Sequence, residues 1–330
     1  MKYRRVGTSD LEISEIAFGC GGNAGLMIKG SPVEQTRIVA RALELGITYF
    51  DNSPDYGDGV AEINLGRVMK ELKVRPLLNS KVEIRAVNLG DVADHVVRSC
   101  EESLTRLGVD VIDMFQIHNG PTAKPLELKG AVYAQLGMPY YPAAIEGIQR
   151  LLDSGKIRTA GFICRGNDAA EVREVLDSGL FRLINIPYTL LNPTAGMKKP
   201  YGLTVDKDFG DEIGLAKARG ASAAIYSPLA SGVLTDDFLA GIRHPLAKPL
   251  DKGPTHQVEA LTFLKEATGV SLAQAALRFV LMNDGVATVL GGFSAMEQLE
   301  ETAKVPDLPL LSPEVMKRLD ALWRSDFRRS

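Results

Sequence analysis

The sequence has few cysteines and no long apolar run. The three cysteines lie far apart, at Cys20, Cys100 and Cys164, so they suit neither a disulfide framework nor a zinc site. Such cysteine usage is typical of a reducing cytoplasm. No apolar run approaches the roughly 18 residues of a membrane-spanning helix, and the first residues lack an apolar signal core. We therefore expect a cytoplasmic protein without a membrane partner.

An excess of charge is also missing. The 330 residues include 38 lysines and arginines against 41 aspartates and glutamates, a net charge of −3, so no basic surface for nucleic acid is expected. Hydrophobic residues make up 45% of the chain, which is ample for a large core. No segment rich in Pro, Gly and Ser divides the chain. We expect one domain over residues 1–330 that binds a small molecule, as a monomer or a homo-oligomer.

Short apolar runs alternate with helical patterns along the chain. Six helical patterns end in a glycine followed by an apolar stretch, as in LELG-ITYF, because glycine readily adopts the left-handed conformation that closes a helix. These glycines are Gly46, Gly108, Gly155, Gly179, Gly220 and Gly269. The apolar runs predict eight strands, over residues 14–19, 47–51, 76–81, 110–117, 157–163, 181–186, 221–227 and 286–290.

Eight strand–helix units in about 300 residues predict an α/β fold of the closed (β/α)8, or TIM barrel, type. The first residues, KYRRVGTSDLEIS, predict an N-terminal β-hairpin, and an amphipathic pattern from Ser312 predicts an extra C-terminal helix. Ser31 and Glu34 fit a capping box for the first barrel helix. The competing fold is an open doubly wound sheet. Residues 19–24 fit its G-x-G-x-x-A pattern, but no helix is expected before Ser31.

The stretch FDNSPDYGDG, residues 50–59, packs three aspartates around Tyr56. Its composition predicts a turn, in which we expect Asp55 and Asp58 to be solvated. Four oxygen-bearing residues also lie at the EF-hand positions 1, 3, 5 and 12: Asp51, Ser53, Asp55 and Glu62. A calcium loop is nevertheless disfavoured, because position 6 is a tyrosine instead of glycine and a strand, not a helix, precedes the loop.

Four chemically useful side chains follow three successive strands. Asp51 ends the second predicted strand and Tyr56 lies five residues later, Lys81 ends the third, and His118 follows the fourth. In a barrel of this type these strand ends meet at one mouth. A buried ammonium there lowers the pKa of a tyrosine from near 10, so that the hydroxyl acts as a general acid. Asp51 would keep Lys81 charged, and a neutral His118 would orient a carbonyl.

Each of these residues also has a structural explanation when taken alone. Asp51 suits a turn or helix cap, Tyr56 a packing position, Lys81 a solvated strand end, and His118 a core position with satisfied hydrogen bonds. All four types at the ends of three successive strands are much less expected by chance. We therefore predict a metal-free catalytic site suited to hydride transfer with a nicotinamide cofactor.

At these residues the sequence resembles the aldo-keto reductase superfamily. The segment ITYFDNSPDYG, continued to Gly66, looks like its first signature, and Lys81 and His118 match its next two marks in order and spacing. The resemblance covers nearly the whole chain. It implies an NAD(P)(H)-dependent oxidoreductase for aldehydes, ketones or sugars. Tyr56 would be the general acid and base, Lys81 and Asp51 would tune it, and His118 would orient the carbonyl.

The resemblance also implies a set of cofactor-binding residues. They are Gly21, Gly22, Cys164, Arg165, Asn185, Tyr226, Ser227, Pro228, Leu229, Gly232, Gly292, Ser294, Gln298, Glu301 and Thr302. Among them, Tyr226 would pack on the nicotinamide and residues 227–232 would bind pyrophosphate. The segment near the adenosine phosphate would comprise Gly292, Ser294, Gln298 and Glu301. Ser294 has a second explanation, since it fits a capping box with Glu297.

Several of these positions depart from the family pattern. Cys164 stands where a serine is usual, and a thiol is the weaker donor. Asn185 replaces a glutamine and Thr302 an asparagine, and the usual lysine after Gly232 is replaced by residues 235–237, Thr-Asp-Asp. Losing cations near a 2′-phosphate weakens the case for NADP(H), which we still favour over NAD(H) because of the resemblance.

The substrate is not named by the sequence. Residues 119–141 exceed the usual loop between a strand and a helix, and long loops at this face are often functional. Their large apolar side chains either wall a substrate pocket or cover the barrel rim or an oligomer contact: Tyr133, Met138, Tyr140 and Tyr141. The loop 236–254 would form a second wall. The alternative function is a non-catalytic regulatory barrel that binds nicotinamide nucleotide, which the presence of all four chemical residues disfavours.

Overall fold

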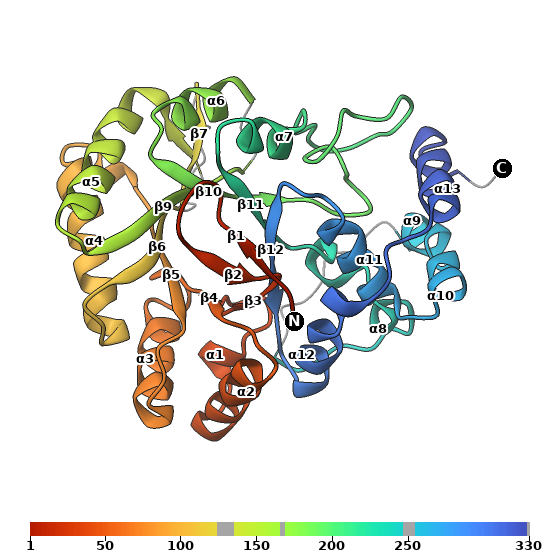
Figure 1. The fold of residues 1–330 in the computed structure, drawn as a ribbon, viewed down its shortest axis with the longest axis horizontal. Coiled ribbons are helices and arrows are strands. Elements are labelled where there is room, and N and C mark those ends of the chain that lie inside the picture. Colours follow the sequence, from red (N-terminus) through yellow and green to blue (C-terminus); the bar gives the residue numbers. More distant parts are fainter. Residues whose placement is uncertain (124–134, 166–168, 247–254, 329–330) are drawn as a thin grey trace.

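Eight parallel strands close into a barrel in the computed structural model, which describes residues 1–123, 135–165, 169–246 and 255–328 (Figure 1). In order around the barrel the strands are β3 (Ile16–Gly19), β4 (Tyr49–Asp51), β5 (Leu77–Val82), β6 (Ile112–Ile117), β9 (Ile157–Ile163), β10 (Phe181–Pro187), β11 (Ser222–Tyr226) and β12 (Val286–Gly292). β12 pairs with β3 and closes the ring. All eight predicted strands and the (β/α)8 fold are confirmed, and the open sheet is excluded.

Helices surround the barrel on its outside (Figure 1). They are α2 (Pro32–Glu44), α3 (Val60–Leu72), α4 (Val92–Leu107), α5 (Tyr141–Asp153), α6 (Ala169–Asp177), α7 (Glu212–Lys217), α8 (Asp236–Leu239), α9 (Thr255–Ala260), α10 (Phe263–Thr268), α11 (Leu272–Leu281) and α12 (Met296–Ala303), with the extra helix α13 (Pro313–Arg324) near the C-terminus. The six glycines predicted to close helices all have a positive φ, between 69° and 83°, and that prediction is confirmed.

Side-chain caps begin several helices. Ser31 accepts from the backbone N–H of Glu34, whose carboxylate accepts from the backbone N–H of Ser31, so the predicted capping box of α2 is confirmed. Ser312 caps α13 in the same way through one bond. The capping box predicted for Ser294 and Glu297 is wrong. The helix α12 begins one residue later, with Ala295 as its N-cap, because Ser294 is bonded to Gln298 instead.

Some short elements were not predicted. The helix α1 (Leu26–Lys29) follows the loop after β3, so a helix does precede Ser31. Four residues are too few to show a helical period. After β6, the strands β7 (Gly120–Thr122) and β8 (Gln135–Gly137) form a small parallel pair outside the barrel. Single 3-10 turns complete the fold: η1 (Ala86–Asn88), η2 (Met138–Tyr140), η3 (Ala230–Gly232) and η4 (Val305–Asp307).

A hairpin covers the N-terminal end of the barrel. β1 (Tyr3–Arg5) and β2 (Glu12–Ser14) pair antiparallel, as predicted, and lie across the barrel in Figure 1. The backbone N–H of Gly7 donates to Ser222 at the start of β11, 2.9 Å away. Val6 and Ile13 are fully buried and join the apolar cluster inside the barrel. The hairpin therefore closes this end and leaves the C-terminal ends of the strands as the mouth.

Arg4 links this hairpin by hydrogen bonds to the segment between α11 and β12. Its guanidinium donates to Glu15 at 2.6 Å and to the carbonyl oxygens of Leu281 at 2.7 Å, Val286 at 2.7 Å and Asn283 at 3.2 Å. The Glu15 side chain is only 4% exposed. One arginine thus compensates a buried carboxylate and caps the carbonyls between α11 and β12.

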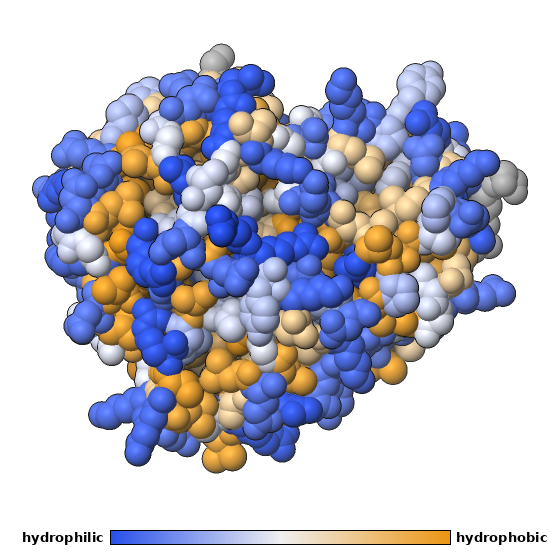
Figure 2. All heavy atoms as spheres, viewed as in Figure 1, coloured by the Kyte–Doolittle hydropathy of each residue, from blue (hydrophilic) through white to orange (hydrophobic). Residues whose placement is uncertain are grey.

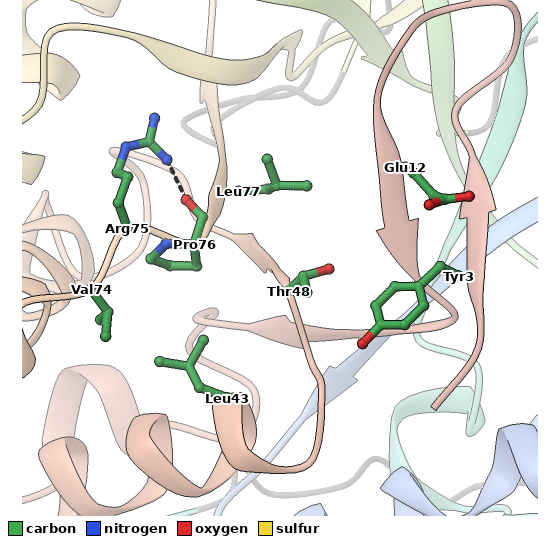
Figure 3. A pocket seen from close by; sticks show the side chains of 8 residues that line it. All are labelled: Tyr3, Glu12, Leu43, Thr48, Val74, Arg75, Pro76 and Leu77. Atoms are coloured by element: carbon green, nitrogen blue, oxygen red, sulfur yellow. Dashed lines mark hydrogen bonds between the residues drawn. The ribbon is translucent and has the colours of Figure 1, made fainter.

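A hollow of about 540 Å3 lies between the hairpin and the starts of β4 and β5 (Figure 3). Its lining is Tyr3, Glu12, Leu43, Thr48, Val74, Arg75, Pro76 and Leu77. Arg75 is already paired with Asp113 at 2.8 Å. Because Thr48 and Pro76 directly precede β4 and β5, the hollow lies at the end of the barrel away from the mouth. It is not where the predicted catalytic residues gather.

The face with the hairpin is shown in Figure 2. Hydrophobic residues there lie in separate groups between hydrophilic ones. Within the described part of the chain, no helix is long and apolar enough to cross a membrane.

Candidate active site

Asp51 and Lys81 form an ion pair at the mouth of the barrel. Asp51 is the last residue of β4, and its backbone pairs with Asn79 of β5. Asn79 and Lys81 are two residues apart on one strand, so their side chains point the same way, toward Asp51. The Lys81 ammonium lies 2.8 Å from Asp51 Oδ1, and the two side chains are 1% and 5% exposed. The ammonium also donates to the carbonyl oxygen of Asn52 at 2.6 Å.

Tyr56 lies against this pair. Lys81 Nζ donates to its hydroxyl oxygen at 3.3 Å, and the hydroxyl donates to Asp51 Oδ2 at 3.4 Å. A side chain at Gly21 would place its Cβ 3.4 Å from the Tyr56 ring, so the loop after β3 packs on that ring. The turn predicted for residues 50–59 therefore folds back and presents its tyrosine to the ends of β3, β4 and β5.

The pKa of Tyr56 does not follow the sequence-based expectation. Burial raises the pKa of Tyr56 to about 12; the Lys81 charge lowers it and the Asp51 charge raises it. The net lowering expected from Lys81 is not found, because burial outweighs it. The pKa of Lys81 is itself raised, since Asp51 and Tyr56 outweigh the effect of burial. At neutral pH the site therefore presents a protonated hydroxyl beside a charged ammonium.

His118 follows β6 directly and lies on the other side of Tyr56. The two rings meet edge to face, with centroids 6.2 Å apart, and His118 is 8% exposed. Its Nδ1 lies 3.1 Å from Asp55 Oδ2 and 3.4 Å from the Ser53 hydroxyl. Burial lowers the pKa of His118 and the hydrogen bond to Asp55 raises it, with burial prevailing. His118 is therefore neutral at neutral pH.

The expectation that Asp55 is only a solvated turn residue is wrong. Its side chain is 22% exposed, and Oδ1 accepts from Arg85 at 3.0 Å. Nothing in the sequence separates it from Asp58, which is exposed as predicted. Only the fold of the turn, which brings Asp55 onto His118, distinguishes the two aspartates.

A row of amide side chains leads from Asp51 across the barrel interior. Asn79 Nδ2 donates to Asp51 Oδ1 at 2.5 Å and to Gln116 Oε1 at 3.0 Å, and Gln116 Nε2 donates to Asn185 Oδ1 at 2.7 Å. All four residues are buried. Because each amide donates toward the next acceptor, the row fixes the amide orientations. Asn79 and Gln116 were not among the predicted site residues, although both lie at the predicted strand ends.

The row ends beside the predicted nicotinamide-binding residues. Tyr226 ends β11, and its hydroxyl donates to the backbone carbonyl of Cys164 at 3.2 Å. The Arg165 guanidinium lies 5.9 Å from the Tyr226 ring centroid. Asn185 accepts from Gln116 through Oδ1, so its NH2 group points away from that bond. The structure thus gathers an aromatic ring, an amide and a guanidinium at the ends of β9, β10 and β11.

The turn after β11 has an unusual backbone. Ser227, Ala230 and Ser231 have φ values of 48°, 48° and 60°, and Gly232 has 97°. Left-handed non-glycine residues are costly, and they cluster where a backbone must hold a fixed shape at a functional site. Pro228 and Leu229 lie inside this turn. The predicted pyrophosphate segment is therefore a strained turn whose backbone groups are locally oriented.

The predicted adenosine segment lies at the start of α12. Gly292 ends β12, and the Ser294 hydroxyl and backbone N–H both donate to Gln298 Oε1, at 3.0 and 2.9 Å. Glu301 accepts from the Ser271 hydroxyl and, through its carbonyl, from Gln274. Glu301, which Thr302 follows in α12, thus faces α11. Ser294 and Gln298 lie at the helix start, where backbone N–H groups favour an anion.

Only some of the residues predicted to wall a substrate pocket lie in the described part of the chain. Tyr141 begins α5 and is fully buried, with its hydroxyl donating to the carbonyl of Asn119 at 2.6 Å. It supports the loop and does not wall a pocket. Met138 is half-buried and Tyr140 is 36% exposed. Tyr133 and residues 247–254 of the second predicted wall lie outside the described residues.

The calcium hypothesis fails on the same geometry. Asp51 is paired with Lys81, and Glu62 is paired with Arg106 at 2.6 Å while it accepts from the Ser80 hydroxyl. These two carboxylates are therefore already paired with cations of the chain. Among the described residues, no group of three or more His, Cys, Asp or Glu could hold a metal ion. In the part of the chain that the structure describes, Cys20, Cys100 and Cys164 form no disulfide and all three are buried.

The family model of the aldo/keto reductase family matches residues 15–324. This chain belongs to the aldo/keto reductase family. The solved structure of an aldo-keto reductase from Bacillus halodurans, AKR11C1 in its holo form, superposes on this one with a TM-score of 0.74. It is 24% identical and the match covers 98% of this chain and 97% of that one, which supports the barrel fold.

Relatives of this aldo-keto reductase carry different names. The chain is 27% identical to a putative voltage-gated potassium channel subunit beta of Schizosaccharomyces pombe, over 97% of this chain and 92% of the relative. It is 25% identical to the L-glyceraldehyde 3-phosphate reductase of Escherichia coli, with the same coverage. It is 25% identical to the L-galactose dehydrogenase of Arabidopsis thaliana, over 98% and 94%. The family is an oxidoreductase family, and its members' names span reductases, dehydrogenases and channel subunits.

Proposed function

We propose that this aldo-keto reductase transfers a hydride between a nicotinamide cofactor and a small carbonyl or alcohol, with Tyr56 as the general acid and base. The observation that carries the proposal is the Tyr56 hydroxyl within 3.4 Å of both Lys81 and Asp51. In reduction, Tyr56 donates its proton to the substrate oxygen as the carbonyl carbon receives the hydride. In oxidation, the hydroxyl proton returns to Tyr56 as the hydride leaves.

The neighbours of Tyr56 would stabilise both of its protonation states. Lys81 stabilises the phenolate that remains after proton donation. Asp51 keeps the buried ammonium charged, since an ammonium without a carboxylate would lose its proton in a dry site. The amide row from Asp51 to Asn185 holds the Asp51 carboxylate in place. The chain therefore supplies proton transfer and orientation.

The residues at β9 to β12 suit a nicotinamide nucleotide. Tyr226 offers a ring for the nicotinamide, Asn185 an amide for its carboxamide, and residues 227–232 a turn of fixed shape for pyrophosphate. Ser294 and Gln298 offer polar donors at the start of α12 for the adenosine phosphate. When bound, the nucleotide would supply or accept the hydride. We propose NADP(H) over NAD(H). We also propose a location in the cytoplasm, because cysteines that form no disulfide are typical of a reducing compartment.

The test of this function is Tyr56→Phe. We expect kcat to fall about 10²- to 10⁴-fold on a panel of aldehydes, ketones and sugars, because the acid is removed. The affinities for NADPH and NADH, followed by fluorescence quenching, should not change, and comparing them tests the cofactor preference. Tyr201→Phe, at a side chain that is 88% exposed, is the matched control. A near-normal kcat in Tyr56→Phe would show that the acid and base lie elsewhere.

A second candidate function is a regulatory barrel that binds nicotinamide nucleotide and acts through a protein partner. The names of relatives from Schizosaccharomyces pombe and from rice, both described as potassium channel β subunits, favour it. The intact arrangement of Tyr56, Lys81 and Asp51 argues for turnover instead. Tight NADPH binding without turnover on the whole panel would favour the regulatory function.

A further inference from the structure

Glu62 is a fully buried carboxylate that the proposed reaction does not use directly. It lies in the first turn of α3, outside the barrel wall. Its Oε1 accepts a hydrogen bond from the Ser80 hydroxyl, and its Oε2 accepts from Arg106 Nε at 2.6 Å. One carboxylate oxygen is therefore bonded to β5 and the other to α4.

The turn that carries Tyr56 ends directly at the helix of Glu62. Three successive residues between them have left-handed backbone angles, with φ values of 68° at Gly57, 52° at Asp58 and 85° at Gly59. A non-glycine residue adopts this region only where its surroundings hold it there. The backbone N–H of residue 61 donates to the carbonyl oxygen of Tyr56 at 3.2 Å. The position of Tyr56 therefore depends on the position of the first turn of α3.

The partner of Glu62 on β5 lies between two residues of the candidate active site. Ser80 is flanked by Asn79 and Lys81, whose side chains both point into the site. Successive side chains of a strand point to opposite faces, so the Ser80 hydroxyl points out of the barrel, toward Glu62. One hydrogen bond thus joins the helix that follows Tyr56 to the strand that carries Lys81.

Arg106 holds the Glu62 carboxylate from the side of α4. A Cβ at Gly59 would lie 2.9 Å from Arg106 Cδ, so the arginine side chain passes directly over the turn before α3. The guanidinium also donates to the Ser103 hydroxyl at 3.1 Å. A buried carboxylate is costly unless a cation compensates it, and the Arg106 side chain is 22% exposed, so this cation still reaches solvent. The pair therefore gives Glu62 a fixed position.

We propose that Glu62 is a positioning residue, which sets the Tyr56 hydroxyl against the Lys81 ammonium by joining α3 to β5. The two hydrogen bonds of that hydroxyl are long, at 3.3 Å to Lys81 and 3.4 Å to Asp51. Bonds of this length leave room for movement, so the distance depends on how the turn is held from behind. The inference rests on the proposed function, because it takes Tyr56 as the general acid and base.

The position of Tyr56 is measured on the free protein by carbon-13 NMR of Cζ in the nine tyrosines, with its signal assigned by the loss in Tyr56→Phe. We expect the Tyr56 signal to shift in Glu62→Ala, which removes the link to β5. The matched control is Glu102→Ala, the exposed partner of the same arginine at 3.7 Å, in which the Tyr56 signal should equal that of the wild type. An unchanged Tyr56 signal in a folded Glu62→Ala protein would overturn the proposal.

The effect on catalysis is measured as a double-mutant cycle with Tyr56→Phe, with the folded fraction taken from urea unfolding. Per folded molecule, Glu62→Ala should lower kcat about 10- to 10²-fold, as expected for a misplaced catalytic group. In the Tyr56→Phe background the same change should lower kcat no further, because the group that it misplaces is absent. An equal loss in both backgrounds would mean that Glu62 does not act through Tyr56, and would overturn the proposal.

Ser80→Ala tests the same link if Glu62→Ala does not fold, because it keeps the pair between Glu62 and Arg106. We expect a shift of the Tyr56 signal and a fall in kcat of about three- to tenfold, the effect of one hydrogen bond. Ser103→Ala, at another buried serine bonded to the same arginine, is the control and should change neither. An unchanged Tyr56 signal and kcat in Ser80→Ala would contradict the proposal.

The two measurements separate this inference from the proposed function. A near-normal kcat in Tyr56→Phe, with a shifted Tyr56 signal in Glu62→Ala, would overturn the proposed function while supporting the link between α3 and β5. A strongly reduced kcat in Tyr56→Phe, with a normal kcat in folded Glu62→Ala, would overturn the positioning role alone.

Discussion

Two buried ion pairs lie at opposite ends of the barrel and differ in what surrounds the cation. At the N-terminal end, Arg4 donates to Glu15 and to three backbone carbonyls. At the mouth, Lys81 donates to Asp51, to one backbone carbonyl and to the Tyr56 hydroxyl. The carboxylates are similarly buried, at 4% and 5% exposure. Burial alone therefore does not separate a structural ion pair from one that we propose to be catalytic.

The two pairs differ in whether a neighbour of the cation can change its protonation state. Every acceptor around Arg4 is a group that holds no transferable proton, so that pair only fastens the hairpin. Lys81 has one neighbour, Tyr56, that changes its protonation state in the proposed reaction. Removing either cation leaves an uncompensated buried carboxylate, which is strongly destabilising. Only the removal of Lys81 should also reduce turnover.

The largest effect is expected for Lys81→Met. The free energy of unfolding should fall by about 3–5 kcal/mol, because Asp51 is left buried without its cation. In the protein that remains folded, kcat should fall about 10²- to 10⁴-fold, because the Tyr56 phenolate is no longer stabilised. Urea unfolding and initial rates measure the two effects. Lys70→Met, at an exposed position of α3, controls for the loss of a lysine. Normal turnover in Lys81→Met would place the two ion pairs in the same class.

Arg4→Met should affect stability alone. We expect a loss of about 2–4 kcal/mol, somewhat less than a fully buried pair gives, since the Arg4 side chain is 25% exposed. Under conditions where the variant is folded, kcat and KM should equal those of the wild type. Arg5→Met, the exposed next residue of β1, is the control. A folded Arg4→Met protein with reduced kcat would mean that the hairpin shapes the mouth. It would contradict the purely structural role that we assign to the Arg4 pair.

The smallest effect is a pH dependence of stability at Glu83. Burial, followed by the charge of Asp55, raises the pKa of Glu83 to about 7 from 4.5. The folded chain thus holds this proton more tightly than the unfolded one, and that stabilisation is present below pH 4.5 and lost as the pH rises through about 7. Glu83→Gln lacks this loss. We define the difference as the unfolding free energy of Glu83→Gln minus that of the wild type. This difference should be about 1–2 kcal/mol larger at pH 8 than at pH 5.

The measurement is urea unfolding of both proteins at the two pH values. Taking the difference between variant and wild type cancels the titration of His118, whose lowered pKa favours folding as the pH rises. Asp55, whose pKa is lowered, is ionised at both pH values and contributes equally. If the difference in unfolding free energy between variant and wild type is the same at pH 5 and pH 8, Glu83 is ionised at both. The cluster around Arg85 would then carry one more negative charge than we infer.

Much of the fold was predictable from the sequence, because it depends on local patterns. The strands are short apolar runs, and the helix ends are marked by glycines such as Gly46 and Gly108, which the structure places in the left-handed region. The meeting of Asp51, Lys81 and His118 at one mouth was predictable because each lies at a strand end, and a closed barrel brings strand ends together. These predictions needed the order of the elements but no knowledge of loop conformations.

The parts that were missed depend on loop conformation. Asp55 and Asp58 have the same composition signal, and only the path of the turn puts one on His118 and exposes the other. The helix α12 begins at Met296 instead of Ala295 because Ser294 is hydrogen-bonded to Gln298. The periodicity of the sequence does not reveal such a bond. The parallel pair of β7 and β8 lies within the long loop after β6, where three-residue strands are too short to show alternation.

The contacts of Arg4 also set an order of events during synthesis. Three of its partners lie 277 to 282 residues further along the chain, and β12 must be present before β3 has its second neighbour. At about 5–20 residues per second, a ribosome needs roughly 15–60 s to make the intervening stretch. During that time the first strand of the ring has an unpaired edge. The hairpin of β1 and β2 is therefore among the last parts of this chain to reach its final position.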